Sequence, residues 1–199
     1  MKRGLDIVAA ALLLVIAAPL LLAGAIAVLV TSGRPVLFGH RRLGRNGVPF
    51  RCWKLRTMQV DAEVVLVAVP QLHAQYVANG YKLPVAADPR VTPLGAFLRR
   101  TYLDELPQLL NVLNGTMSLV GPRPVVEEEL RNYGEHGAEL LRVRPGIVGE
   151  WTSRGRARPP YPERARVELA YIHDASLRND LRILVRALPV ILLGQTEDA

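Results

Sequence analysis

The stretch LDIVAAALLLVIAAPLLLAGAIAVLV, residues 5–30, carries a single charged side chain, Asp6. A helix needs about 20 apolar residues to cross the hydrocarbon core of a bilayer, and this stretch is longer than that. The sequence therefore predicts that the N-terminal part of the chain lies in a membrane.

Three membrane arrangements compete for this stretch. A signal peptide is disfavoured because its apolar region is roughly 7–15 residues long. A simple spanning helix should have more Lys and Arg on one side than on the other. Here basic residues lie on both sides: Lys2 and Arg3 before the stretch, and Arg34, Arg41, Arg42 and Arg45 after it. Pro19 lies mid-segment and removes a backbone donor, which favours a bend. We expect residues 1–33 to form a re-entrant membrane helix broken at Pro19.

Length and charge limit the rest of the chain. The 199 residues leave room for one further domain, residues 34–199, which we expect to be a cytosolic catalytic domain. The net charge of +7 comes almost entirely from arginine, which favours recognition of phosphate or carboxylate. The single cysteine, Cys52, excludes an intrachain disulfide and a cysteine-based metal cage. A reducing, cytosol-facing location fits this composition.

The predicted fold class is α+β and mainly helical. Arg45-Asn46-Gly47 lies between two apolar runs, the strongest short signal for a β-hairpin, so a basic hairpin should follow the membrane segment. An extended stretch is expected over 147–152 and a basic loop over 154–160. Helices are expected at residues 61–78, 94–100, 104–114, 127–143, 163–172 and 177–193.

The last of these helices has an apolar stripe and several arginines. A basic amphipathic helix of this kind is typical of a membrane surface, although a core helix with solvated arginines fits equally well. If the first interpretation holds, the globular domain carries interfacial amphipathic helices. The stripe consists of Leu181, Leu184, Val185, Leu188, Ile191 and Leu192, and the arginines are Arg178, Arg182 and Arg186.

The pair Asp104-Glu105 is the strongest candidate for chemistry. Asp104 is a plausible N-cap for the following helix, with Pro107 in its first turn and Asn114-Gly115 at its end. Adjacent helical residues point about 100° apart, so the two acids should take separate roles. One can attack phosphorus and the other can help to hold Mg²⁺. The alternative is that both merely complement the helix dipole.

Seven segments together resemble the small bacterial polyprenyl-phosphate phosphoglycosyl transferases, a monotopic sugar transferase family. Any one of them alone is a weak signal, and the combination is specific. The segments are residues 2–6 (KRGLD), 45–50 (RNGVPF), 54–58 (KLRTM), 98–109 (LRRTYLDELPQL), 111–113 (NVL), 117–124 (MSLVGPRP) and 144–147 (RPGI).

This resemblance implies a reaction and a place for it. Asp104 would attack the β-phosphate of a UDP-sugar, release UMP and carry a covalent phosphosugar, which polyprenyl (undecaprenyl) phosphate then takes. Glu105, with Asp104, would hold Mg²⁺, or Glu105 would help to activate the acceptor. The reaction would be the first membrane step of glycoconjugate or exopolysaccharide assembly, at the cytoplasmic face of the bacterial inner membrane. The membrane phospholipid is then a further partner, and a homodimer is left open.

The resemblance also implies a set of phosphate-binding or nucleotide-binding residues. For each of them the alternative is an ordinary surface or structural ion pair. The set consists of Lys54, Arg99, Arg123, Arg144 and Arg156.

The chain departs from the family pattern at four positions near these motifs. The family usually has an acid at Thr116, a serine at Tyr102, a small polar residue at Ala18 and a glutamine at Thr152. The acids at 104 and 105 are kept, so sugar specificity rather than catalysis is in question. A second hypothesis is a membrane-tethered basic module that binds anionic lipid or nucleic acid. On the enzyme hypothesis, no nucleic acid partner is expected.

Overall fold

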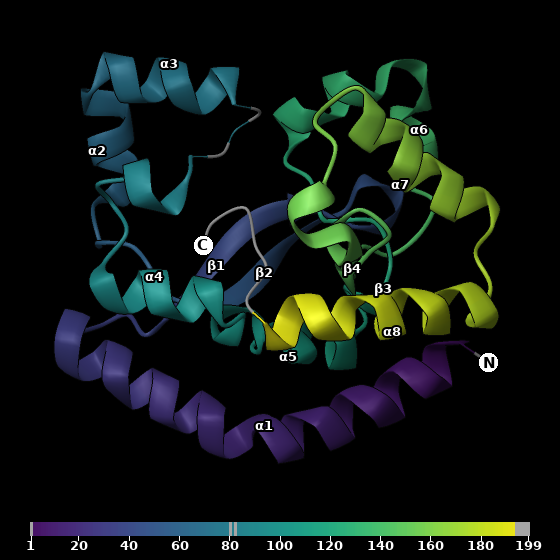
Figure 1. The fold of residues 1–199 in the computed structure, drawn as a ribbon, viewed down its shortest axis with the longest axis horizontal. Coiled ribbons are helices and arrows are strands. Elements are labelled where there is room, and N and C mark those ends of the chain that lie inside the picture. Colours follow the sequence, from purple (N-terminus) through teal and green to yellow (C-terminus); the bar gives the residue numbers. More distant parts are fainter. Residues whose placement is uncertain (1, 80, 82, 194–199) are drawn as a thin grey trace.

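The computed structural model describes residues 2–79, 81 and 83–193, without the side chain of Arg156. The predicted domain 34–199 thus extends past the described residues at its end. The fold is α+β and mainly helical, as predicted, with two small sheets beside a long N-terminal helix (Figure 1). In chain order the elements are α1 Lys2–Ser32, β1 Leu37–Leu43, η1 Arg45–Gly47, β2 Pro49–Leu55, α2 Ala62–Ala68, α3 Pro70–Ala78, η2 Val85–Ala87, α4 Pro93–Arg100, η3 Leu103–Glu105, α5 Gln108–Asn114, β3 Ser118–Val120, η4 Glu127–His136, α6 Gly137–Leu140, β4 Gly146–Val148, η5 Thr152–Ala157, α7 Glu163–His173 and α8 Leu177–Leu192, where η marks a 3-10 helix.

Helix α1 is long and apolar enough to cross a membrane. It continues through Pro19 rather than ending there, and Figure 1 shows it bowed, with both ends turned toward the globular part. Only Asp6, Ala10, Gly24 and Val28 are buried, two in each arm. The middle of α1 stays exposed and apolar. The re-entrant path stays a prediction, because the structure contains no membrane.

Polar contacts hold the N-terminal end of α1 to the globular part. Lys2 forms an ion pair with Asp180 of α8. The buried Asp6 carboxylate accepts hydrogen bonds from Ser118 Oγ at 2.8 Å and from the Leu119 amide at 3.3 Å. Buried carboxylates require partners of this kind, so the first turns of α1 are fixed against β3.

The C-terminal end of α1 is held by the buried side chain of Arg56. Its guanidinium donates to the carbonyl oxygens of Ser32, of Gly33 at 2.9 Å and of Arg34 at 3.2 Å. These include carbonyls that the end of a helix leaves without an intrahelical partner. Both ends of α1 are therefore bound to the same globular body.

Strands β1 and β2 pair in an antiparallel register, with Leu43 opposite Pro49 and His40 opposite Cys52. The connection over Arg45–Gly47 places Asn46 at φ 60° and Gly47 at φ 75°. Asn and Gly tolerate this left-handed conformation better than other residues.

Strands β3 and β4 pair in parallel, and two glycines allow the adjoining chain segments to touch. A Cβ atom on Gly146 would lie 2.1 Å from the amide nitrogen of Gly121. A contact this short excludes any side chain, so glycine is required here. This close approach of Gly121 and Gly146 brings the segment that ends at Arg123 against the start of β4.

The main core lies between the β1–β2 hairpin, α5 and the first arm of α1. Val112, Met117 and Ala10 are fully buried there, together with Cys52 and Leu109. Each large apolar side chain buried in this way contributes about 1.5–3 kcal/mol. Helix α1 is thus part of the core that supports the hairpin.

Four predicted segments outside the candidate site differ from those observed. The helix expected at 61–78 is two helices, α2 and α3, which meet at Val69 and Pro70. The helix expected at 127–143 is instead η4, interrupted at Gly134 with φ 55°, followed by the single turn α6. The extended stretch expected at 147–152 is only the short strand β4, and part of the loop expected at 154–160 belongs to η5.

Candidate active site

Helix α4 positions Arg99. The Thr92 hydroxyl caps α4 by accepting from the Gly95 amide at 2.9 Å, and Pro93 begins the helix. A Cβ atom on Gly95 would lie 1.9 Å from the carbonyl oxygen of Thr57, so only glycine allows this approach. Arg99 Nε then donates to Thr57 Oγ1 at 3.0 Å. The guanidinium is therefore held at the end of β2, beside the acidic pair.

Asp104 lies in the tight turn η3 and not at the start of a regular helix. Tyr102, before this turn, adopts a left-handed conformation at φ 57°, and α5 begins only at Gln108. No side-chain cap bond is made by Asp104, so the predicted N-cap is wrong. The predicted end of the helix is correct, because Gly115 has φ 88°.

The Lys54 ammonium group links β2 to both acids of the turn. It forms an ion pair with Glu105 and lies 3.9 Å from Asp104 Oδ2. Glu105 also accepts a hydrogen bond from Gln108, so both of its oxygens have partners. Asp104 is 4% exposed, and among the described residues its buried Oδ1 has no hydrogen-bond partner. One carboxylate oxygen is thus available to a ligand.

Burial sets the ionisation of this pair. Desolvation raises the pKa of Asp104 to about 7, although Lys54 and Arg99 act to lower it. Burial alone would lower the pKa of Lys54, but the carboxylates of Glu105 and Asp104 outweigh it and raise that pKa. Lys54 is therefore a fixed positive charge beside an acid that ionises near neutrality. Such perturbed groups are typical of functional sites.

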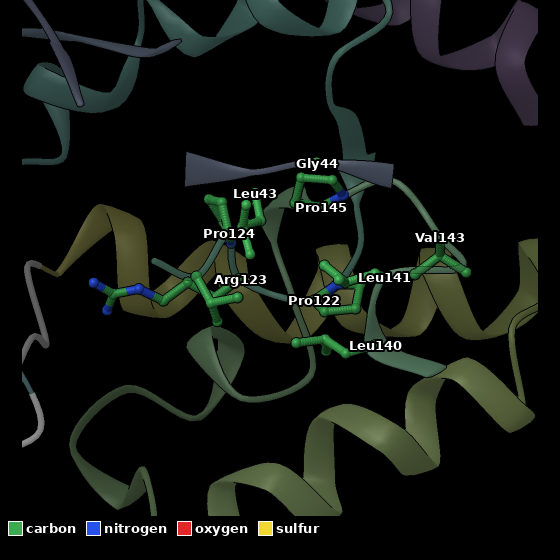
Figure 2. A pocket seen from close by; sticks show the side chains of 10 residues that line it. Leu43, Gly44, Pro122, Arg123, Pro124, Leu140, Leu141, Val143 and Pro145 are labelled. Carbon is green, nitrogen blue, oxygen red and sulfur yellow. The ribbon is translucent and has the colours of Figure 1, made fainter. Parts of the chain in front are cut away.

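Arg123 approaches from the segment that follows β3. Its amide donates to Glu168 at 2.9 Å, and its guanidinium lies 5.7 Å from the ring centre of Trp151. Figure 2 shows this side chain extending away from the apolar residues around Pro122 and Pro124. Its guanidinium forms no ion pair with any carboxylate among the described residues, so its charge is available to an anion.

Buried charges behind Trp151 support this arrangement. Arg164 packs over the Trp151 ring at 4.5 Å and lies 3.4 Å from Glu129 Oε2 and 3.8 Å from Glu168 Oε1. Burial raises the pKa of Glu168 to about 7. Since Glu168 holds the amide of Arg123, this network sets the position of the Arg123 segment.

Sequence reasoning did not identify Arg158 as a contact of the residue that precedes η3. Its Nη2 donates to Tyr102 Oη at 2.8 Å and to the Thr152 carbonyl at 3.0 Å, and it packs over Trp151 at 5.1 Å. The segment that contains Arg156 is thereby tied to the turn that contains Asp104. No motif in the sequence indicates this contact, because Arg158 lies within a run of arginines and prolines.

Two further phosphate ligands were predicted, Arg144 and Arg156. Arg144 Nε donates to the Gly115 carbonyl at 2.8 Å, so this side chain closes the end of α5. Arg156 lies in η5, and its side chain lies outside the description. For both residues a role at the phosphates stays a prediction.

The two acids of the turn fit a cation that is bound partly by the protein and partly by the substrate. Among the described residues no group of three or more His, Cys, Asp or Glu side chains is placed to hold a metal. Mg²⁺, however, is often bound by one or two carboxylates together with substrate phosphates. Asp104 Oδ2 and the Glu105 carboxylate, which lie beside Lys54 in this turn, would supply these ligands, and Asp104 Oδ1 would not be needed as one.

Comparison with known proteins gives the family. A model described as bacterial sugar transferase matches residues 1–194, and the chain belongs to this family. Exopolysaccharide production protein ExoY of Rhizobium meliloti is 40% identical over 198 residues, which cover 98% of this chain and 86% of that protein. The undecaprenyl-phosphate galactose phosphotransferase of Salmonella typhimurium is 40% identical over 196 residues, 96% of this chain and 40% of that protein.

A third relative is the UDP-glucose:undecaprenyl-phosphate glucose-1-phosphate transferase of Caulobacter vibrioides. It is 42% identical over 199 residues, which cover 96% of this chain and 69% of that protein. The chain therefore spans most of ExoY but less than half of some other relatives.

Proposed function

We propose that this chain transfers a sugar-1-phosphate from a UDP-sugar to undecaprenyl phosphate, releasing UMP. The family and the named activities of its relatives support the reaction class. The observation in the structure that carries the proposal is the buried Asp104, whose free Oδ1 lies in a turn flanked by Lys54 and Arg99. The glycan that the product starts is an exopolysaccharide or a related glycoconjugate.

The proposed chemistry has two displacements at one phosphorus atom. Asp104 Oδ1 attacks the β-phosphorus of the donor, the bond from that phosphorus to the bridging oxygen breaks, and UMP leaves. A phosphate oxygen of the acceptor then attacks the same phosphorus, and the bond to Asp104 breaks. The product is a polyprenyl diphosphate sugar, and the Asp104 carboxylate is restored.

The cationic side chains around Asp104 would position the phosphates and neutralise their charge. Phosphoryl transfer depends mainly on positioning and on neutralising charge in the transition state. Lys54 lies beside the nucleophile, and Arg99 and Arg123 approach from α4 and from the segment after β3. Mg²⁺, held by Asp104 and Glu105 with the substrate phosphates, would neutralise further charge on the diphosphate.

The proposal includes a re-entrant path for α1. Both of its ends are bound to one globular body, Lys2 and Asp6 at one end and the Arg56 contacts at the other. A helix with its two ends on opposite sides of a bilayer cannot make both sets of contacts. Its exposed apolar middle would therefore enter one leaflet only, with the site at the cytoplasmic face of the inner membrane.

Nucleotide release from a panel of UDP-sugars tests the function. Detergent-solubilised full chain is incubated with Mg²⁺, undecaprenyl phosphate and each donor, for the wild type and for Asp104→Asn. We expect UMP from the wild type with at least one donor and none from the variant. Release of UDP would mean transfer of the sugar alone, and UMP release that survives Asp104→Asn would remove Asp104 as the nucleophile.

A further inference from the structure

His40 lies beside the site on the β1–β2 hairpin, and the predicted residues do not include it. Its cross-strand partner is Cys52, and Lys54 follows two residues later on the same face of β2. Diagonal neighbours of this kind are about 7–8 Å apart, within reach of a lysine side chain. His40 is therefore next to the residue that contacts Asp104.

One contact fixes the tautomer of the imidazole. Arg42 Nη2 lies 3.1 Å from His40 Nδ1, and a guanidinium can only donate hydrogen bonds. Nδ1 must therefore accept, and the proton of the neutral ring lies on Nε2. Arg42 is itself held by Glu129 Oε1 at 3.1 Å. Nε2 has no hydrogen-bond partner among the described residues.

The surroundings keep this ring neutral. Burial and, to a smaller extent, the charges of Arg42, Lys54 and Arg123 together lower the pKa of His40 to about 3. Lys54 is paired with Glu105 and Arg42 with Glu129, whereas the Arg123 guanidinium has no ion pair among the described residues. The ring thus presents a neutral N–H donor amid groups that attract an anion.

We propose that His40 donates a hydrogen bond through Nε2–H to a phosphate oxygen of the substrate. Arg42 and Glu129 act as positioning residues, because they hold the ring in the tautomer that can donate. This assignment rests on the proposed function, and the phosphate belongs either to the nucleoside diphosphate or to the lipid acceptor.

Two substitutions of His40 distinguish the loss of the hydrogen-bond donor from a change in packing. Glutamine can present an amide N–H where Nε2–H stands, whereas leucine fills similar space without a donor. His73→Leu, at an exposed histidine of α3, is the matched control. For each full-length variant, the dissociation constant of UDP is measured by calorimetry, and the KM for undecaprenyl phosphate is measured by nucleotide release.

Removing a hydrogen bond to a charged oxygen weakens binding by about tenfold or more. We expect His40→Leu to weaken UDP binding by about tenfold if the oxygen belongs to the nucleotide, or to raise the acceptor KM by that factor if it belongs to the lipid. His40→Gln should stay within about threefold of the wild type, and His73→Leu should not change. Wild-type behaviour of His40→Leu in both assays, or equal loss in His40→Gln, would overturn the proposal.

A spectroscopic measurement keeps the test valid if a variant fails to fold or if no donor supports turnover. At pH 5, nitrogen-15 NMR of histidine-labelled wild-type protein should show a neutral ring with the proton on Nε2, absent from His40→Gln. That signal should shift when UDP or undecaprenyl phosphate is added. A proton on Nδ1, or no shift with either ligand, would disprove the assignment even if the transferase activity is confirmed.

Discussion

The surroundings of Asp104 disfavour the ionised form of its carboxyl group. Because its pKa is raised in the folded state, its contribution to stability is largest at acid pH and is lost as the pH rises through about 7. We expect Asp104→Asn to abolish turnover and to raise the free energy of unfolding at pH 8, by at most about 4 kcal/mol.

Denaturant unfolding in EDTA at pH 5 and pH 8 checks this expectation. The difference between the wild type and Asp104→Asn should be larger at pH 8. Asp61→Asn, at an exposed acid, is the control and should change little at either pH. A destabilised Asp104→Asn at pH 8 would show that the ionised carboxylate is stabilised by its neighbours.

The second prediction at the scale of one residue concerns Lys54. Since it lowers the pKa of Asp104 against the effect of burial, Lys54→Met should raise that pKa. In the proposed reaction the ionised acid is the nucleophile, so activity should be lost as the pH falls through this pKa. The rising limb of kcat/KM against pH should move to higher pH by about one unit or more. Arg166→Met, at an exposed arginine paired with Glu163, should leave the limb in place.

At the scale of elements, helix α4 depends on one glycine. Gly95→Ala would place a methyl group against the Thr57 carbonyl, where a Cβ lies 1.9 Å away. The helix must then move, and Arg99 loses its contact with Thr57 Oγ1. We expect the KM for the donor to rise. We also expect the free energy of unfolding to fall by about 1–3 kcal/mol, as for other overpacked contacts. Gly4→Ala, with open space around the new methyl group, is the control.

Helix α8 exposes the apolar stripe that the sequence predicted. Leu181, Val185 and Leu188 are 63%, 59% and 53% exposed, and Ile183, Ala187 and Val190 on the other face are buried. Both faces of α8 are thus apolar, which favours the membrane-surface interpretation over that of a core helix with one solvated face.

Lipid contact by α8 can be measured with an added tryptophan. Leu181→Trp in liposomes made with brominated lipid should be quenched more strongly than the wild type. Arg182→Trp, at an exposed basic residue about 100° away around the same helix, should be quenched less. Equal quenching of the two variants would contradict a stripe that faces lipid.

At the scale of the whole molecule, the path of α1 decides where the site lies. If α1 is re-entrant, Gly4→Cys and Thr31→Cys are both on the cytoplasmic side. A membrane-impermeant maleimide should label neither in intact cells and both after permeabilisation. The native Cys52 is buried and 3% exposed, so its background should be low. Labelling of Gly4→Cys from outside would show a spanning helix.

The sequence by itself determined the features that depend on near neighbours. The apolar run of α1, the Asn46-Gly47 turn and the stripe of α8 follow from hydropathy and turn preference within a few residues. The acidic pair was found in the same way, from adjacent letters. Predictions from near neighbours were wrong where one residue adopts an unusual backbone conformation, as at Gly134 and at Tyr102 before η3.

Only the tertiary structure decided which side chains share the site. The contacts Lys54–Glu105, Arg42–Glu129 and Tyr102–Arg158 join residues 50 to 90 positions apart. No periodicity or spacing along the chain specifies them, because they exist only once the hairpin, the turn and η5 have packed together. Burial, which raises the pKa of Asp104 and keeps His40 neutral, is likewise a property of the packed molecule, since it depends on how much water the surrounding elements exclude.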